Sequence, residues 1–276
     1  MIDAQVHCYE RDHPGRPWKA ALAGPPEVTG NEMIVAMDEV GVDGAILVSV
    51  HTMYRFDESY AVSVQQAHPD RFALVKPFDP RVPETADEMM AAWAGTPGAV
   101  GGRIMLTHAS ENPDDPGINA IAAAAGTHGL PLNMLCWGRL DQMAQIAANH
   151  PGTRFVIDHL GLEQPFAPPV PDEPFAELPG VLALAAHDNV VIKITGACTL
   201  SHEPFPYPDL WPSLEQIFTA YGLDRCLWGT DWTRATELLT YPQGVDSFTT
   251  TDRLSDSDRQ TLMHDTCARV YGWSPA

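Results

Sequence analysis

The sequence predicts a (β/α)8 barrel, and three observations support this prediction. Short β-rich runs recur eight times along the 276 residues. Most of these runs are almost continuously apolar, as expected for parallel strands that helices cover. Segments with helical periodicity separate the runs, and strand–helix alternation over about 250 residues is typical of this barrel. A doubly wound open sheet is the structural alternative, but its first strand would normally lead into a Gly-rich phosphate-binding turn, which is absent.

The expected strands follow one another along the chain. They are Ile2–His7, Gly44–Val50, Phe72–Phe78, Val100–Leu106, Leu130–Cys136, Phe155–His159, Val190–Thr195 and Cys226–Asp231. The expected helices are Asn31–Val40, Ser59–His68, Thr85–Ala94, Ile118–Thr127, Leu140–Asn149, Phe175–His187 and Leu210–Tyr221. Gly41 follows the first helix at the position of a C-cap. No segment has the composition of a linker, so we expect residues 1–276 to form one domain.

The Pro-rich segment Gln164–Pro179 follows the sixth expected strand. Its prolines restrict the backbone and indicate an ordered loop, either a lid over a site or a surface insertion. In a (β/α)8 barrel the loops after the strands form the catalytic face.

Composition and charge exclude several classes of partner. The formal net charge is −20, with only 16 Lys and Arg residues, so we expect neither nucleic acid nor an anionic membrane as a partner. No apolar stretch reaches the ~18 residues of a membrane span, and the N-terminus lacks the pattern of a secretory signal. Five Cys without a CxxC pair indicate a reducing, cytoplasmic location. The oligomeric state has no signal in the sequence.

Polar residues lie at the carboxyl ends of the expected strands, which a barrel brings to one mouth. His7, Arg103, His159 and Asp231 are the four that we expect to converge there. Charged groups in apolar runs are costly unless they are paired or functional. A structural role stays open for each: Arg103 in a buried ion pair, and His159 with Asp231 as a structural pair.

Other residues are candidates of second rank. Gln5 precedes His7 by two residues, so both share one face of the first strand. Lys193 lies within the seventh strand and His51 just beyond the second, and each is either a site residue or a structural one. Trp232 directly follows Asp231 and is expected to line the mouth. Asp158 is expected to point away from its neighbour His159 as a structural cap.

Five segments together resemble the amidohydrolase superfamily, in its amidohydrolase-2 branch. They are DAQVH, GGRIML, FVIDHLG, VVIKITG and LWGTDW, and the resemblance continues to the C-terminal LMHDTCARVYGW. Within this branch, the chain resembles the group of lactonases that includes 2-pyrone-4,6-dicarboxylate lactonase. The resemblance implies a barrel with an HxH pair on strand one, further His on strands five and six, and an Asp on strand eight. Many members bind one divalent metal through these groups, whereas the pyrone lactonase type works without one.

Carried over to this chain, the resemblance makes His7 the second His of the HxH pair, His159 the strand-six His and Asp231 the strand-eight Asp. Arg103 falls where such lactonases use an Arg for a substrate carboxylate. The chain departs twice, because Gln5 replaces the first His and the fifth strand has no His. A stable Zn²⁺ site normally needs three protein ligands, so we expect no metal cofactor. The alternative is one divalent metal, such as Zn or Mn, bound weakly by His7 and Asp231.

The resulting prediction is a lactonase-like hydrolase that acts on a small carboxylated lactone or related cyclic ester. Asp231 would activate water, and His7 and His159 would polarise the carbonyl. The expected substrate-binding residues are Arg103, Gln5, Lys193, His51 and Trp232. Two alternatives stay open: a metal-dependent decarboxylase of an aromatic or unsaturated acid, and a non-catalytic barrel that binds a ligand.

Overall fold

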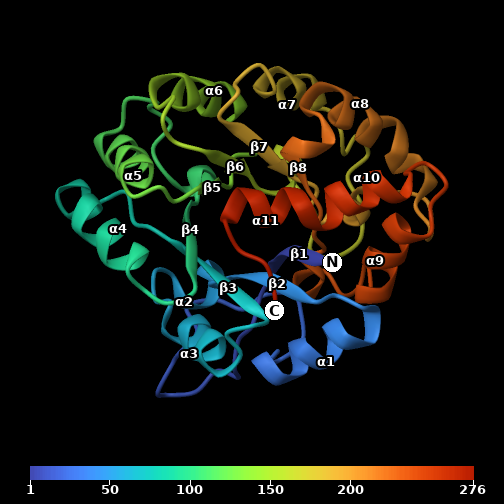
Figure 1. Ribbon diagram of the computed structural model, residues 1–276, viewed down its shortest axis with the longest axis horizontal. Coiled ribbons are helices and arrows are strands. Elements are labelled where there is room, and N and C mark those ends of the chain that lie inside the picture. Colours follow the sequence, from blue (N-terminus) through green and yellow to red (C-terminus); the bar gives the residue numbers. More distant parts are fainter.

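The computed structural model describes residues 1–276 and has the predicted (β/α)8 architecture (Figure 1). Backbone hydrogen bonds from Ala4 N to Trp228 O (3.0 Å) and from Asp231 N to Gln5 O (3.1 Å) connect the first strand to the residues that follow the last. Eight parallel strands pair in chain order: β1 (Ile2–Val6), β2 (Gly44–Val48), β3 (Phe72–Pro77), β4 (Ala99–Ile104), β5 (Leu132–Met134), β6 (Phe155–Ile157), β7 (Val190–Lys193) and β8 (Cys226–Leu227).

All eight expected strands are confirmed, but each ends earlier than expected. β6 ends at Ile157 because His159 and Leu160 have φ angles of 55° and 58°, which a strand does not accommodate. Asp231, beyond the end of β8, has a φ of 51°. His7, His159 and Asp231 therefore lie just outside the ladder, where side chains do not alternate between two faces, whereas Arg103 lies within β4.

Helices surround the strands. The seven expected helices are confirmed within a few residues, and Gly41 caps α1 with a φ of 73°, as predicted. The bounds are α1 (Gly30–Val40), α2 (His51–Tyr54), α3 (Ser59–Ala67), α4 (Ala86–Ala94), α5 (Pro116–Thr127), α6 (Leu140–Asn149), α7 (Leu178–Leu184), α8 (Trp211–Tyr221), α9 (Tyr241–Thr249), α10 (Asp256–Gln260) and α11 (Thr266–Tyr271).

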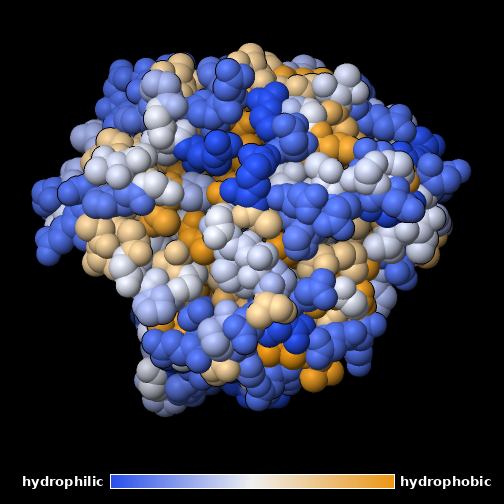
Figure 2. Space-filling model, in the orientation of Figure 1, coloured by the Kyte–Doolittle hydropathy of each residue, from blue (hydrophilic) through white to orange (hydrophobic).

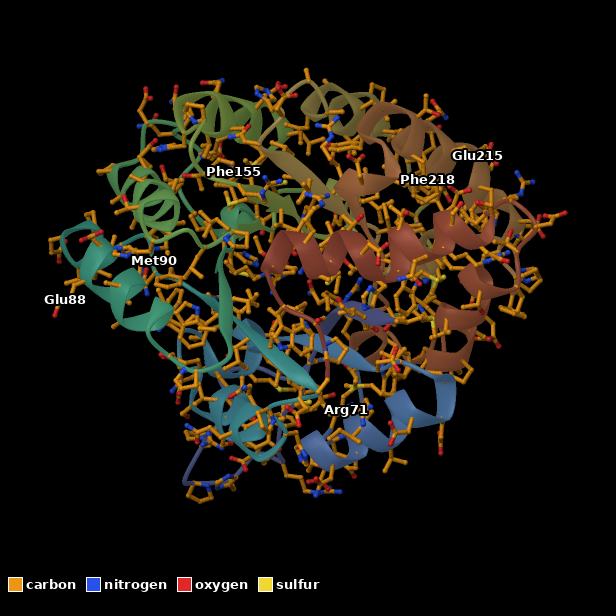
Figure 3. All side chains as sticks on the ribbon, viewed as in Figure 1. Arg71, Glu88, Met90, Phe155, Glu215 and Phe218 are labelled. Carbon is orange, nitrogen blue, oxygen red and sulfur yellow. The ribbon has the colours of Figure 1, made fainter.

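Two groups of apolar side chains build the core. The larger lies between the strands and the surrounding helices: Met90 and Phe155 are fully buried in it, whereas Glu88 and Glu215 are on the outside of α4 and α8 (Figure 3). The smaller group combines alternate strand residues such as Val48 with Cys267, Val270 and Tyr271 of α11. Helix α11 lies across the barrel in Figure 1 and packs on Ile2 and Ala4, where β1 begins. The barrel is thereby filled at this end, which leaves the carboxyl ends of the strands for a site.

The face seen in Figure 2 is mostly hydrophilic, with hydrophobic residues scattered over it. None of the helices combines the length and the apolar character that crossing a bilayer requires.

Candidate active site

Gln5 lies in strand β1, and His7 directly follows the end of that strand at Val6. The pairing of β1 with β2 shifts register between Asp3 and Val6, which is the pattern of a β-bulge. Asp3 stabilises this irregular segment, because its carboxylate accepts from the backbone N–H groups of Gln5 and Thr230, each at 3.0 Å. The hydrogen bonds of Asp3 therefore fix the backbone from which Gln5 and His7 project, in addition to the contacts of their side chains.

His7 and Asp231 form a buried pair. The Nδ1 atom of His7 lies 2.7 Å from the carbonyl oxygen of Val48, and its Nε2 atom lies 3.2 Å from Asp231 Oδ1. Since a carbonyl group only accepts, Nδ1 of His7 carries a proton. Nε2 of a neutral His7 is then an acceptor that faces a second acceptor, and Oδ1 of Asp231 has no hydrogen-bond partner in the structure. His7 Nε2 and Asp231 Oδ1 can therefore hold one proton between them.

Arg234 holds the other oxygen of Asp231. Its Nε atom donates to Asp231 Oδ2, and its Nη2 atom donates to the amide oxygen of Gln164. Burial alone would raise the pKa of Asp231, but the Arg234 guanidinium, with His7 next, outweighs it and holds the pKa well below its usual value. Asp231 is therefore a carboxylate at neutral pH.

His159 has partners on both ring nitrogens. Its Nδ1 atom lies 3.1 Å from the hydroxyl oxygen of Thr195, and its Nε2 atom lies 3.2 Å from the amide nitrogen of Gln5. Asp231 Oδ2 is 3.7 Å from Nε2, too far for a good hydrogen bond. Burial lowers the pKa of His159 to about 3, although Asp231 opposes this effect. The imidazole is therefore neutral at neutral pH.

Asp158 is the centre of a second buried network. It accepts from Arg103 Nε at 2.7 Å and lies 3.2 Å from Lys193 Nζ. Burial would raise the pKa of Asp158, but Arg103 and Lys193 lower it to about 2. The expectation that Asp158 is a structural cap is wrong, because its side chain makes no cap hydrogen bond and pairs with Arg103 and Lys193 instead. Arg103 thus forms a buried ion pair, which was one of the two roles considered for it from the sequence.

A cavity of about 210 Å³ lies at the mouth of the barrel. Four predicted residues, together with His51, line it, which confirms that the strand ends converge. The lining residues include His7, His51, Arg103, His159 and Asp231, with Met105, His108, Leu135, Trp137, Gln164, Phe166 and Arg234. The cavity is smaller than a typical site for a drug-sized ligand, so it suits a small molecule.

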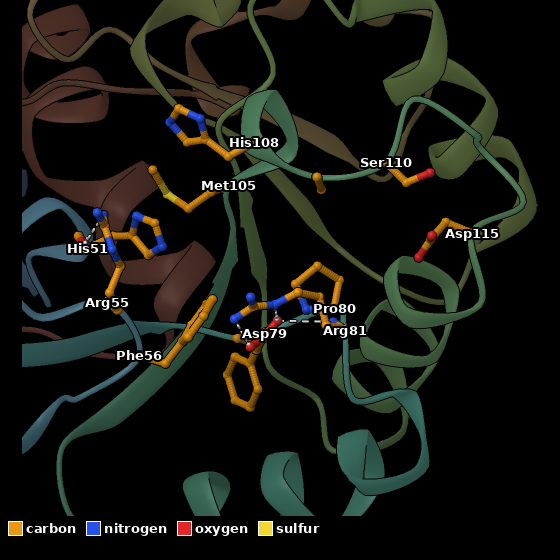
Figure 4. Close-up of a pocket in the computed structure, with 12 residues that line it drawn as sticks. His51, Arg55, Phe56, Asp79, Pro80, Arg81, Met105, His108, Ser110 and Asp115 are labelled. Atoms are coloured by element: carbon orange, nitrogen blue, oxygen red, sulfur yellow. Dashed lines mark hydrogen bonds and ion pairs between the residues drawn. The ribbon is translucent and has the colours of Figure 1, made fainter.

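A larger cavity of about 610 Å³ adjoins the first (Figure 4). The two share His51, Met105 and His108, and the rings of His51 and His108 stack with centroids 6.3 Å apart. Burial, with the charges of Arg103 and Arg55, lowers the pKa of His51 to about 4. His51 is therefore a neutral residue between the two cavities.

Three of the expected substrate-binding residues do not reach the cavity. Gln5 and Lys193 are fully buried beneath it and contact His159 and Asp158 instead. Trp232 stacks on Tyr241 and borders a separate depression next to α1. The positive φ of Asp231 turns the chain, so that Trp232 lies next to helix α1 and not at the mouth of the barrel. The lining of the cavity thus contains none of these three residues.

Four residues that line the site were not among the site residues predicted from the sequence. Arg234, Gln164, Phe166 and His108 all lie in loops that follow strands. Arg234 had a possible signal, since it lies three residues after Asp231 in the segment TDWTR, and Gln164 and Phe166 belong to the Pro-rich segment that was considered as a lid. The loop at Gln164 is ordered, as predicted: the amide nitrogen of Gln164 donates to the carbonyl of Thr195 at 3.0 Å. Phe166, 44% exposed, covers the Arg234 guanidinium at 5.0 Å.

The donor set does not fit the divalent metal that many amidohydrolases bind. The Nε2 lone pair of His159 faces the Gln5 amide, and one oxygen of Asp231 is paired with Arg234. The Lys193 ammonium lies 3.0 Å behind Gln5, at Oε1. No group of three or more His, Cys, Asp or Glu side chains has the arrangement of a metal site. The guanidinium of Arg234 and the ammonium of Lys193 are therefore two fixed positive charges next to the side chains that a metal ion would have to bind.

The family model for amidohydrolases matches residues 2–273, which is nearly the whole chain. The chain belongs to the amidohydrolase family. The family that the sequence motifs indicated is thereby confirmed.

Three curated relatives of this amidohydrolase are named for lactones. The L-fucono-1,5-lactonase of Burkholderia ambifaria is 31% identical over 150 residues, 52% of this chain and 49% of that protein. The 4-sulfomuconolactone hydrolase of Rhizobium radiobacter is 40% identical over 80 residues, 29% of this chain and 25% of that protein. The D-galactarolactone isomerase of Agrobacterium fabrum is 26% identical over 237 residues, 84% of this chain and 75% of that protein. The matches to the first two thus span half or less of those proteins.

Solved structures resemble this amidohydrolase over almost its full length. An amidohydrolase from Burkholderia multivorans has a TM-score of 0.81 at 22% identity over 98% of each chain, and it was solved with HEPES and, separately, with zinc. A probable 2-pyrone-4,6-dicarboxylic acid hydrolase from Acinetobacter baumannii, with citric acid bound, has a TM-score of 0.79 at 19% identity over 99% of each chain. A 2,6-dihydroxybenzoate decarboxylase from Rhizobium has a TM-score of 0.70 at 14% identity over 99% of each chain. These likenesses show the fold alone.

Proposed function

We propose that this amidohydrolase is a hydrolase that opens a small carboxylated lactone or related cyclic ester without a metal ion. The observation that carries the proposal is the pair of facing acceptors, His7 Nε2 and Asp231 Oδ1, in a small cavity that also contains Arg103. The lactone names of three relatives support it.

Arg103 is the proposed receptor for a substrate carboxylate. Its Nε atom is fixed on Asp158, whereas its two terminal nitrogens have no hydrogen-bond partner in the protein. A guanidinium held in this way presents a fork of N–H groups that matches a carboxylate. The pair with Asp158 orients Arg103 before any ligand binds, which lowers the entropy that binding costs.

The proposed chemistry begins with water bound against the His7–Asp231 pair. As the water oxygen forms a bond to the lactone carbonyl carbon, its proton moves to the position between Nε2 and Oδ1. The carbonyl electrons become an alkoxide, and the imidazolium of His7 stabilises it. When the alkoxide collapses, the ring C–O bond breaks and the leaving oxygen takes the proton back. The product is a hydroxy acid, which releases a proton to the solvent on ionising.

This scheme gives Asp231 and His7 the roles expected for them and changes that of His159. A neutral His159 with its proton on Nδ1 has no N–H directed at the cavity, because Gln5 lies at its Nε2. We therefore assign the polarisation of the carbonyl to His7, and we assign His159 to the wall beside it.

The test is turnover by dialysed protein whose metal content has been measured. A panel of carboxylated lactones and of benzoate-type acids separates the candidates, with acid release followed by titration and CO₂ by gas analysis. We expect acid release without CO₂, unaffected by a chelator. Asp231→Asn should lower kcat by roughly 10²–10⁴-fold, the usual range for loss of a general base. Asp256→Asn, at an exposed carboxylate, is the matched control.

Other results would identify the alternatives. Release of CO₂ that depends on added Zn²⁺ or Mn²⁺ would favour the decarboxylase. Binding of lactones with no turnover would favour a ligand-binding barrel. Full activity of Asp231→Asn would exclude Asp231 as the group that activates water.

A further inference from the structure

We infer that Lys193, acting through Gln5, fixes His159 as the tautomer with its proton on Nδ1 and fills the Nε2 lone pair that a metal ion would need. The inference itself stands on buried hydrogen bonds, and only its consequence for catalysis rests on the proposed function. It makes Gln5 and Lys193 positioning residues.

The direction of the Gln5 amide follows from Lys193. Lys193 Nζ lies 3.0 Å from Gln5 Oε1, and an ammonium group can only donate. If the amide were turned around, its NH₂ group would face the ammonium, and two donors would meet in a fully buried place. The oxygen of Gln5 must therefore face Lys193, and the NH₂ group must face His159.

The proton of His159 follows from that direction. The Gln5 NH₂ group lies 3.2 Å from Nε2 of His159, so a neutral imidazole satisfies it only by offering the lone pair of Nε2. The ring proton then lies on Nδ1, 3.1 Å from Thr195 Oγ1, which accepts it. The same hydroxyl oxygen accepts the backbone N–H of His159 at 3.2 Å and has two lone pairs for these two bonds.

Lys193 is itself held in place. Its ammonium lies 3.2 Å from Asp158 Oδ1 and 5.9 Å from the centre of the Tyr271 ring. Burial lowers the pKa of Lys193, but the ionised Asp158 carboxylate beside it opposes that effect. Asn133 Nδ2 lies 3.4 Å from the same carboxylate, and Tyr271 donates to Asn133 Oδ1 at 2.9 Å. The chain of contacts thus runs from helix α11 to the site.

This arrangement explains why a glutamine stands where family members carry a metal-binding His. The amide occupies the Nε2 lone pair of His159, and the ammonium of Lys193, paired with Asp158, places a positive charge behind it. A divalent ion would have to displace the amide and approach this ammonium. Gln5 therefore positions His159 and is not the remnant of a metal ligand.

The test is the ¹⁵N and ¹H NMR spectrum of the full-length protein labelled at its His side chains, with the His159 signals assigned by their loss in His159→Asn. We expect Nδ1 of His159 in the protonated range of shifts and Nε2 in the unprotonated range at neutral pH. Added Zn²⁺ should leave both shifts unchanged. A proton on Nε2 in the unaltered protein would overturn the inference.

Two variants test the relay. Gln5→Glu presents a carboxylate oxygen to Nε2, so the His159 proton should move there. Lys193→Met frees the amide to turn, so a mixture of the two tautomers should appear. Gln142→Met is the matched control: Gln142 is a comparably buried glutamine whose amide donates to the Ser110 carbonyl, and its loss should leave His159 unchanged.

The outcomes separate the inference from the proposed function. If His159 keeps its tautomer in both variants, or changes it equally in the control, Lys193 and Gln5 do not set it. If a variant fails to fold, the spectrum of the unaltered protein and the other variant still decide. None of these measurements needs turnover, so a protein that hydrolyses no lactone could still show the predicted tautomer.

Discussion

At the scale of single residues, the site is controlled by the placement of positive charge. Asp158 and Asp231 are both completely buried carboxylates, and each has its own guanidinium partner. The two differ in what remains free. Asp158 is also satisfied by Lys193, whereas Asp231 keeps one oxygen, Oδ1, without a hydrogen bond. The same side-chain type thus orients Arg103 in one case and is open to chemistry in the other.

Replacing Arg103 with Met tests its role as the carboxylate receptor. Loss of a charge-assisted contact of about 1.5–3 kcal/mol should raise KM for a carboxylated lactone roughly 10- to 100-fold. The methyl ester of the same lactone should be hydrolysed with nearly unchanged KM, since it carries no charge for Arg103 to bind. Arg103→Lys keeps the charge but loses the fork, so an intermediate KM is expected. Equal losses for the acid and its ester would contradict the assignment.

Replacing Arg234 with Met should change both stability and the pH profile. The folded-state pKa of Asp231 lies below its unfolded value of about 3.9, so the pair stabilises the fold above that pH and the stabilisation is lost as pH falls. Breaking this buried pair should cost about 3–5 kcal/mol in urea unfolding at pH 7, and less at low pH. The pKa of Asp231 should rise, which moves the acidic limb of kcat/KM to higher pH.

A suitable control for Arg234 is Arg253→Met. Arg253 pairs with Glu215 at 2.7 Å on the surface, where both side chains are about half exposed. Surface pairs contribute about 0–1 kcal/mol, so this variant should unfold almost like the unaltered protein. An acidic limb that stays in place in Arg234→Met would show that another group limits activity at low pH.

At the scale of elements, the strands and helices could be predicted because each depends on the apolar periodicity of its own segment of the sequence. The convergence of His7, Arg103, His159 and Asp231 followed from the barrel topology alone. Asp158 and Trp232 were misplaced because the chain turns through positive φ next to each of them, which periodicity does not encode. Arg234, Gln164, Phe166 and His108 were missed because loop residues are positioned by tertiary contacts.

Strand β5 decides whether the family's metal site can be restored. Its Asn133 is occupied by Tyr271 on one side and Asp158 on the other, so the strand offers no ligand. Gln5→His should therefore retain no stoichiometric Zn²⁺ after dialysis, as measured by elemental analysis and calorimetry. The ammonium of Lys193, now 3.0 Å from Gln5 Oε1, adds a repulsive charge. Tight binding by this single variant would mean that other ligands complete the site.

At the scale of the whole molecule, an anionic substrate meets an unfavourable field. The formal net charge is −20, and the cations near the cavities are few. Arg81 in the outer cavity is already neutralised by Asp79, with nitrogen–oxygen distances of 2.6 and 2.8 Å. Arg103 and Arg234 are likewise paired with carboxylates, and only Arg55 of the outer cavity, which donates to the carbonyl of His51, has no carboxylate partner. The local charges thus select the ligand once it arrives but do little to attract it from a distance.

Salt should therefore accelerate capture of an anionic lactone. The Debye length falls from about 30 Å at 0.01 M to about 8 Å at 0.15 M, which screens the repulsion of the distant carboxylates more than the contact with Arg103. When capture limits the rate, kcat/KM for a carboxylated lactone should rise severalfold over this range. The uncharged methyl ester serves as the control, and its kcat/KM should stay constant. A decrease with salt for the acid alone would show that the cations around the cavities dominate the field, so that the acidic surface does not oppose association.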